Sequence, residues 1–177
     1  MKKLVFIFTF AIIANTISAQ SKKDEQDIKN TIQLLQKGWN AGSGKIFASA
    51  FSEPHDFIVW NGYYMKNNTV ENNEKSHNFI YQKFYKDTQL FYTIDKIKYL
   101  SNDIALVHML GAVVSNTEQK PTDPQVLISM VIQKDNGNWR IVSFHNLDLE
   151  VFQNEETKKN APLPVQVMYS SWYAETN

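Results

Sequence analysis

The chain has 177 residues, of which 13% are aromatic and 20% are charged, and its 18 basic residues balance its 18 acidic ones. Because no block of Lys and Arg rises above the scattered charges, the composition argues against a nucleic-acid partner. The absence of cysteine excludes a thiolate nucleophile and any cysteine-based metal site.

The first 19 residues have the pattern of a secretory signal peptide. Lys2 and Lys3 precede an apolar run over residues 4–14, and a short polar segment then leads to Ala19. The run is far shorter than the roughly 20 apolar residues of a transmembrane helix. We therefore predict cleavage after Ala19, export to the periplasm or the exterior, and no membrane attachment afterwards. The alternative is a buried first helix, but nothing polar interrupts the run to form a solvent-facing side.

Removal of this segment leaves a chain of the size of one ordinary domain. We expect residues 20–152 to form that domain and residues 153–177 to form a C-terminal extension. The extension begins polar, contains Pro162 and Pro164, and turns apolar from Val165 to Tyr173. It could cover the domain edge, reach across a partner subunit, or hang free as a loose end.

Two helices are predicted at the start of the domain. Residues 24–40 carry one apolar stripe at helical spacing, which is typical of an amphipathic helix; the stripe consists of Ile28, Ile32, Leu35 and Trp39. A shorter helix is expected over residues 45–51, stopped by Pro54. His55, beside that proline, is expected to be exposed.

A short hairpin and a third helix follow. Residues 57–60 and 63–65 are β-type runs on either side of Asn61-Gly62, the dipeptide that favours a type I′ turn. From Asn68 to about Asp87 the pattern is helical again. Asn68 is the expected N-cap with Glu71 three residues later, and the shared face would hold Val70, His77, Tyr81 and Phe84.

The remainder of the domain is rich in branched and aromatic residues and is predicted to be β throughout. Polar turn sequences separate four runs, at residues 89–100, 104–115, 125–134 and 139–150. These runs predict a four-stranded antiparallel meander.

This order of elements resembles the nuclear-transport-factor-2-like superfamily, which includes the ketosteroid isomerases and SnoaL-like proteins. Within it, the chain looks most like the SgcJ/EcaC group. The resemblance spans Asp24 to Glu150 and depends on order and spacing, because no single motif is strong. The segments that carry it are Trp39-Asn40-Ala41-Gly42, Phe57 with Trp60-Asn61-Gly62, the helix with His77 and Phe79, residues 103–108, residues 137–141, and His145-Asn146.

The resemblance implies an α+β fold in which a cone-shaped, curved antiparallel sheet wraps around three helices and leaves a tapered cavity. Members are often dimers that associate through the sheet. We therefore expect a small-molecule ligand, a homodimer, and neither a cofactor nor a metal.

Histidines are the first candidates for chemistry, because their pKa of about 6.5 allows proton exchange near neutrality. His77, His108 and His145 all lie within apolar patterns. A buried ring must find hydrogen-bond partners or a water-filled cavity, since an unpaired polar group costs about 1–3 kcal/mol. Each could be a satisfied core histidine, but convergence of all three would indicate a pocket. We expect His145 to point inward, because the opposite choice would bury Arg140 and Asp148.

The candidate catalytic residues are accordingly His145, His77 and the carboxylate Asp56, with Asp95 as a second available acid. The histidines show no spacing typical of metal ligands, so no metal site is predicted. Ligand contacts are expected from aromatic and polar side chains near the cavity, although ordinary core packing would explain the aromatic ones equally well. They are Trp60, Tyr64, Phe79, Tyr81, Phe84, His108, Ser143 and Asn146.

Three functions are open at this point. The leading one is a secreted or periplasmic small-molecule-binding SnoaL-like domain, with isomerase or hydratase-type proton transfer as its catalytic form. The alternative is a non-catalytic module for dimerisation or protein association, suggested by the apolar segment Val165 to Tyr173. A metal-dependent hydrolase is the weakest reading.

Overall fold

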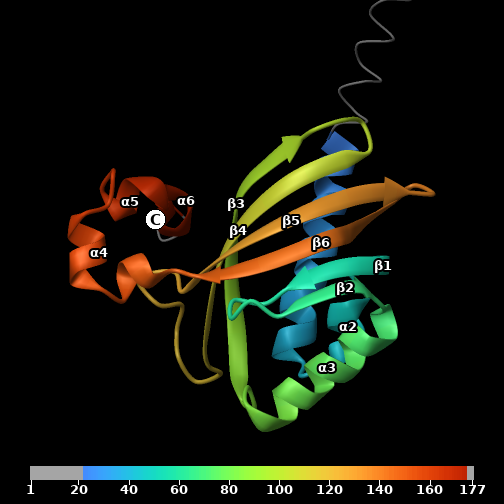
Figure 1. Cartoon of the computed structure of the whole chain (residues 1–177), viewed down its shortest axis with the longest axis horizontal. Helices are drawn as coiled ribbons and strands as arrows, with labels where there is room; N and C mark the ends of the chain where they lie inside the picture. Colours follow the sequence, from blue (N-terminus) through green and yellow to red (C-terminus); the bar gives the residue numbers. More distant parts are fainter. Residues whose placement is uncertain (1–21, 175–177) are drawn as a thin grey trace, which may run out of the picture.

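The structure, a computed structural model, describes residues 22–174, so the predicted signal peptide lies outside the described residues. A curved sheet carries an N-terminal helix and two further helices on one side (Figure 1). The N-terminal helix covers residues 22–40, followed by α2 (Gly44–Ala48) and α3 (Val70–Lys83). The strands are β1 (Phe51–Ile58), β2 (Tyr64–Asn68), β3 (Thr88–Tyr99), β4 (Ile104–Ser115), β5 (Val126–Asp135) and β6 (Asn138–Asp148). A 3-10 turn, η1 (Glu150–Phe152), ends the domain, and the extension holds α4 (Glu155–Lys159), α5 (Val165–Met168) and α6 (Ser170–Ala174).

The six strands form one sheet in the order β2-β1-β6-β5-β4-β3. The predicted meander is confirmed, because β3 to β6 pair antiparallel in sequence order. The predicted hairpin is also confirmed, as β1 pairs antiparallel with β2. The hairpin joins the meander through a parallel pairing of β1 with β6. The α+β fold with a curved sheet around helices is therefore the observed one.

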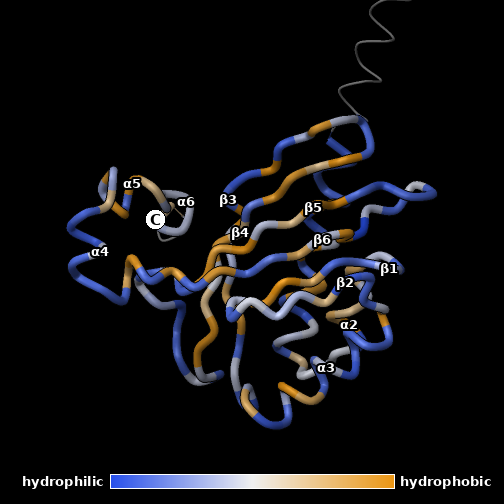
Figure 2. The backbone as a smooth tube through the Cα atoms, viewed as in Figure 1, coloured by the Kyte–Doolittle hydropathy of each residue, from blue (hydrophilic) through white to orange (hydrophobic). Residues whose placement is uncertain are grey.

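The core lies between the inner face of the sheet and the N-terminal helix. Ile28, Ile32 and Leu35 of the predicted stripe are fully buried there, against β-strand residues such as Met130 and Ile132. Alternate residues of each strand face this core, so the strands show hydrophobic segments in Figure 2. Within the described part of the chain, no helix is long and apolar enough to cross a membrane.

Local boundaries differ from the predictions at three places. The second helix ends at Ala48, and Phe51 already belongs to β1 in register with Ile141. Asn68 is not the N-cap of α3; that residue is Thr69, whose side chain accepts a hydrogen bond from Asn72 N. The third difference is the turn between β1 and β2. A type I′ turn needs a positive φ at both central residues, but in this turn only Gly62 has one.

A bulge in β6 decides which side chains face the core. Trp139 and Ile141 are buried in it, but the register shifts after Ile141, and Phe144 is the next core residue. His145 therefore lies on the outer face of the sheet and is exposed. The prediction that His145 points inward is wrong, because the argument assumed an uninterrupted two-residue alternation.

The C-terminal extension packs on the outer face of the same domain, on the other side of the strands from the N-terminal helix (Figure 1). Trp172 is only 1% exposed and lies among Leu110, Ala112 and Leu149. Its indole donates hydrogen bonds to the carbonyl oxygens of Pro121 and Thr122, at 3.3 and 3.1 Å. Of the alternatives left by the sequence, the extension covers its own domain.

Candidate ligand-binding site

A row of polar residues occupies the inward face of α3. Asn73, His77 and Tyr81 follow one another at steps of four, so they share one side of the helix, and all three are buried. An amphipathic helix normally turns an apolar stripe to the core. We call these three residues the polar stripe of α3. Apolar packing does not explain why polar side chains are buried there.

His55 anchors the N-terminal end of the polar stripe. Its ring is 2% exposed, whereas the sequence had suggested an exposed residue; it lies within β1, and its ring packs against Phe51. Nδ1 lies 2.9 Å from the Ser52 carbonyl oxygen, and Nε2 lies 2.9 Å from Asn73 Nδ2 and 3.3 Å from Asn68 Nδ2. The neutral tautomer with its proton on Nδ1 satisfies all three contacts, donating once and accepting twice. Burial lowers the pKa of His55, which favours this neutral form.

His77 occupies the middle of the polar stripe. Its Nδ1–H donates to the Asn73 carbonyl oxygen at 3.0 Å, and its ring stacks on Phe47 with centroids 3.9 Å apart. Burial lowers the pKa of His77 to about 4, so the imidazole is neutral at pH 7. Nε2 is then an acceptor, and no hydrogen bond from a described residue reaches it.

Three buried polar atoms have no hydrogen-bond partner among the described residues. They are Asn73 Oδ1, Tyr81 Oη and Asn146 Oδ1. Leaving such a group unpaired costs about 1–3 kcal/mol, so each of these atoms calls for a partner, either an ordered water or a ligand. Two of the three belong to the polar stripe, and the third lies on β6.

A continuous series of ring contacts connects these elements. Tyr81 contacts Trp39 and His77, with centroids 5.3 and 5.7 Å apart. His77 contacts Phe57 at 5.7 Å, and Phe57 stacks on Phe144 of β6 at 4.5 Å. Asn146 follows two residues after Phe144 on the same strand face. Of the predicted site residues, His77, Tyr81 and Asn146 therefore belong to the inner side of the domain.

A pocket of about 630 Å³ opens beside Tyr81. Its walls come from the end of the N-terminal helix, the end of α3 and the start of β3, and they include Trp39, Tyr85 and Thr88. The Trp39 indole donates to Thr88 Oγ1 at 3.1 Å and meets the Tyr85 ring edge-on at 4.9 Å. An aromatic wall with polar groups at its edge is typical of a small-molecule site. Tyr81 is the one predicted site residue in this wall.

The remaining predicted aromatic residues do not form a ligand wall. Trp60, Tyr64 and Phe79 are exposed, and Phe84 is 71% exposed. Trp60 lies in the hairpin turn, and Phe79 and Phe84 meet each other on the solvent side of the helix, with centroids 6.0 Å apart. The prediction placed Phe84 on the same helix face as Tyr81, but α3 ends at Lys83 and its periodicity does not extend further.

The Asp56 side chain connects β1 to β2 through hydrogen bonds. Its carboxylate accepts hydrogen bonds from the Tyr64 hydroxyl and from Asn67 N, each at 3.0 Å. These two bonds, the backbone one first, hold the pKa of the Asp56 carboxyl below its usual value. An ionised surface carboxylate with both bonds made is poorly suited to act as a general base inside a cavity.

The other predicted residues lie on the outer face of the sheet. His108 Nδ1 lies 3.0 Å from Ser129 Oγ, and Ser129 is in register with His145 on the next strand. Ser143 lies two residues before His145 on β6 and pairs with Val131, so it shares this outer face. The three histidines therefore do not converge: His77 lies inside the domain, and His108 and His145 lie outside it.

Sequence reasoning missed Asn73, Asn68 and His55 as members of the buried polar group. The spacing of Asn73, His77 and Tyr81 was a usable signal, since polar residues four apart share a helix face. The described residues contain no group of three or more His, Cys, Asp or Glu that could hold a metal ion.

No protein-family model and no curated protein matches the chain. Solved structures do match. A domain of unknown function with a cystatin-like fold from Nostoc punctiforme has 22% identity and a TM-score of 0.65, over 86% of this chain and 96% of the other. An NTF-2 like protein of unknown function from Shewanella oneidensis has 21% identity and a TM-score of 0.58, over 71% and 99%.

A third similar structure carries the name of an enzyme. The hexachlorocyclohexane dehydrochlorinase LinA-type3 from Novosphingobium barchaimii is 11% identical, with a TM-score of 0.62, over 75% of this chain and 90% of that one. The chain thus has the cystatin-like fold of the NTF2-like proteins, which is the fold that its element order predicted. At these identities the likeness defines the fold alone.

Proposed function

We propose that this domain binds a small, largely apolar molecule that carries a hydroxyl or carbonyl group, beside Tyr81 on the inner side of α3. The observation that carries the proposal is the Tyr81 hydroxyl, which is buried without a partner in a residue that also lines the 630 Å³ pocket. A donor already removed from water gains a full hydrogen bond when a ligand supplies the acceptor.

Tyr81 and the aromatic residues of the pocket wall have distinct roles in this proposal. Burial raises the pKa of the Tyr81 phenol, so the phenol keeps its proton and donates to a ligand oxygen. His77 and Asn146 do not line this pocket. The rings of Trp39 and Tyr85 supply the apolar contact surface.

Binding is a better supported function than proton transfer. Of the predicted catalytic residues, only His77 lies on the inner side, and a pKa of about 4 makes it a weak base at neutral pH. No carboxylate of a described residue bonds to its ring to raise that pKa. The narrower, isomerase or hydratase-type form of the proposal would use His77 Nε2 as the base, in a fold that also includes a protein named as a dehydrochlorinase.

A thermal-shift screen of the purified protein against a broad metabolite panel tests the proposal. A ligand present at 100 times its Kd should add about 2.7 kcal/mol to the free energy of unfolding. Tyr81→Phe should then weaken that ligand's binding about tenfold while the far-UV spectrum is unchanged. Tyr63→Phe, at a tyrosine that is 70% exposed, is the matched control and should bind normally. A panel without any hit, or a Tyr81→Phe variant that binds as well as the wild type, would refute the site.

A second function, association of two copies through the sheet, is favoured by the part of the outer face that the extension leaves uncovered. Leu147 is 50% exposed there, and Leu106 and Val131 are only partly buried. We propose a homodimer through this surface. Light scattering over a concentration series tests it, and Leu147→Glu should then yield a monomer. A wild-type chain that is monomeric at every concentration would exclude the dimer.

Export is the remaining proposal. N-terminal sequencing of the protein recovered from its native cells should begin at Gln20, the residue after the proposed cleavage site. Recovery of the protein with residues 1–19 still attached would contradict it.

A further inference from the structure

A second pocket, of about 430 Å³, lies between the N-terminal helix and the turn that joins β5 to β6. The helix contributes one stripe of residues, which includes Lys23, Asp27, Thr31 and Lys37, and the turn side contributes residues 137–140. We call this pocket the helix–turn groove. None of its lining residues lines the pocket beside Tyr81.

Positive charge exceeds negative charge in the helix–turn groove. Lys23, Lys37 and Arg140 line it, against the single carboxylate of Asp27, and that carboxylate is already paired with Lys23 at 2.5 Å. The nearby Asp24 carboxylate is paired with Lys134 at 2.7 Å. Among residues 22–174, no carboxylate lies within ion-pair distance of Lys37 or Arg140. Two cationic side chains of the groove are thus left without a carboxylate partner.

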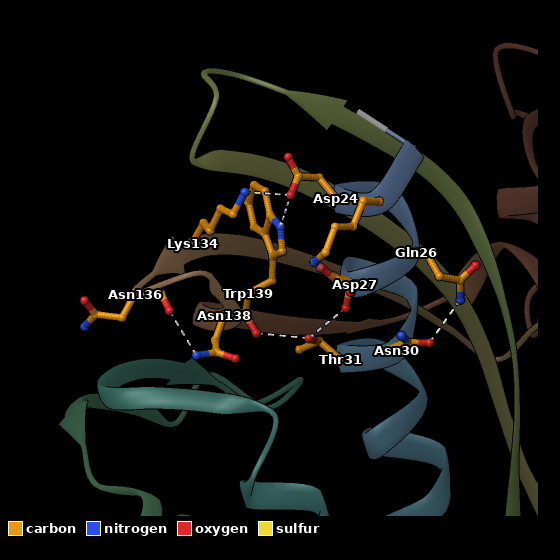
Figure 3. A network of polar contacts seen from close by, with 10 residues as sticks. Asp24, Gln26, Asp27, Asn30, Thr31, Lys134, Asn136, Asn138 and Trp139 are labelled. Atoms are coloured by element: carbon orange, nitrogen blue, oxygen red, sulfur yellow. Dashed lines mark hydrogen bonds and ion pairs between the residues drawn. The ribbon is translucent and has the colours of Figure 1, made fainter. Parts of the chain in front are cut away.

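The Arg140 guanidinium, in the wall of the groove, is held against the backbone of its own strand. Its Nη1 donates to the Trp139 carbonyl oxygen at 3.2 Å, and the Thr31 hydroxyl donates to the same oxygen at 3.0 Å. Figure 3 shows Thr31 and Trp139 meeting in this way across the helix and the strand. One bond uses one of the five guanidinium N–H groups, so the others can still donate.

Amide groups add further donors along the helix side. Asn30 Oδ1 already accepts from Gln26 Nε2 at 3.0 Å, which orients the Asn30 amide so that its NH₂ group can donate. Thr31 and Lys37 are six residues apart, about 9 Å along a helix. Thr31, which shares the Trp139 carbonyl oxygen with Arg140, and Lys37 thus lie at separate points along the groove, and the apolar Leu34 side chain lies in the wall between these two helix positions.

We propose that the helix–turn groove binds a small organic dianion, with one carboxylate or phosphate group on Arg140 and a second on Lys37. Arg recognises such groups through paired N–H donors, and Lys acts as a point charge. A short carbon chain between the two anionic groups packs against Leu34. This site is independent of the proposed function of the α3 pocket.

Isothermal titration at constant ionic strength tests the site, with succinate as the dicarboxylate, 3-phosphoglycerate as the probe with one phosphate and one carboxylate, and sodium chloride as the blank. At least one probe should bind saturably with one molecule per chain. Arg140→Gln and Lys37→Gln should each weaken that binding fivefold or more. Lys159→Gln, at an exposed lysine of the extension, is the control and should leave it unchanged.

Two results would overturn the proposal: heats for both probes that do not exceed the chloride blank, or binding that survives both substitutions. Circular dichroism of each variant reports whether it folds. Should Arg140→Gln fail to fold, Lys37→Gln decides the question alone, because Lys37 is an exposed helix residue whose side chain makes no hydrogen bond or ion pair with another described residue.

Discussion

The Asp24 carboxylate and the Trp139 indole lie 3.2 Å apart in the interior, joining the start of the N-terminal helix to the start of β6 (Figure 3). The same carboxylate oxygen accepts from Lys134 Nζ at 2.7 Å. Asp24 is 6% exposed, and Trp139 is fully buried. One buried charge thus fixes the helix against the β5–β6 hairpin.

Replacing Asp24 should therefore destabilise the fold. Asp24→Ala leaves the Lys134 ammonium partly buried without its carboxylate, and removing one partner of a buried pair costs about 3–5 kcal/mol. Denaturant unfolding measures the loss. Asp27→Ala, which breaks the exposed pair with Lys23 one turn away, is the control and should change stability little. If the two substitutions lowered the free energy of unfolding equally, the buried Asp24 pair would add no more stability than the exposed one.

Stability should fall in mild acid because His77 is buried as the neutral imidazole. Its pKa is about 4 in the folded protein, and it returns to about 6.5 on unfolding. Between these values the unfolded chain binds a proton that the folded chain excludes, so stability is full above pH 6.5 and falls as the pH drops to 4. The total loss is about 3 kcal/mol, from roughly 1.4 kcal/mol per pH unit.

Unfolding free energies at a series of pH values test this slope. His77→Gln should flatten most of it between pH 6.5 and 4. The residual slope comes from His55, whose pKa burial also lowers. A wild-type stability that is constant over this range would mean that His77 accepts a proton without cost.

Removing residues 161–177 should uncover the apolar outer-face cluster that contains Leu110, Ala112 and Leu149. We expect the truncated protein to lose several kcal/mol of stability and to self-associate, since newly exposed apolar patches promote association. The point variant Trp172→Ala should cost about 3–5 kcal/mol, as for other fully buried tryptophans. Scattering and denaturant unfolding report both effects. A truncated chain that stays monomeric and equally stable would show that the extension is dispensable.

Gly44 is required at the contact between α2 and α3. A Cβ at this position would lie 2.2 Å from the Glu74 carbonyl oxygen, and Gly44 N donates to Asn78 Oδ1 at 2.8 Å. Gly44→Ala should therefore separate the two helices and cost about 1–3 kcal/mol, or more, by overpacking. Lys45→Ala, at the exposed neighbouring residue, should be nearly neutral. Thermal unfolding measures both variants. A Gly44→Ala melting temperature equal to that of Lys45→Ala would contradict the close contact.

Periodicity and turn residues were sufficient to predict the meander and the three helices. The Asn136-Gly137 turn illustrates why: both residues take a positive φ, as a two-residue type I′ hairpin requires, so local chemistry decides the register. The parallel pairing of β1 with β6 could not be predicted in this way. It joins segments far apart in the chain, and no local pattern encodes it.

The candidate site was harder to predict because it depends on which face of its helix or strand each side chain occupies. Tyr81 and His77 could be placed from helical spacing, but His145 could not, since one bulge residue in β6 reverses the face of every later side chain. His55 was missed because Pro54 suggested a turn where the chain runs as a strand. Burial of a polar residue depends on tertiary neighbours that the sequence does not name.

The parallel β1–β6 pairing also limits when the sheet can be completed during synthesis of the chain. Strand β1 has only the short β2 beside it until the last strand of the sheet has been synthesised up to Asp148. Contacts between such distant segments form late and slowly. A nascent chain therefore keeps its early apolar surfaces open to chaperones and proteases until translation of the domain is nearly finished.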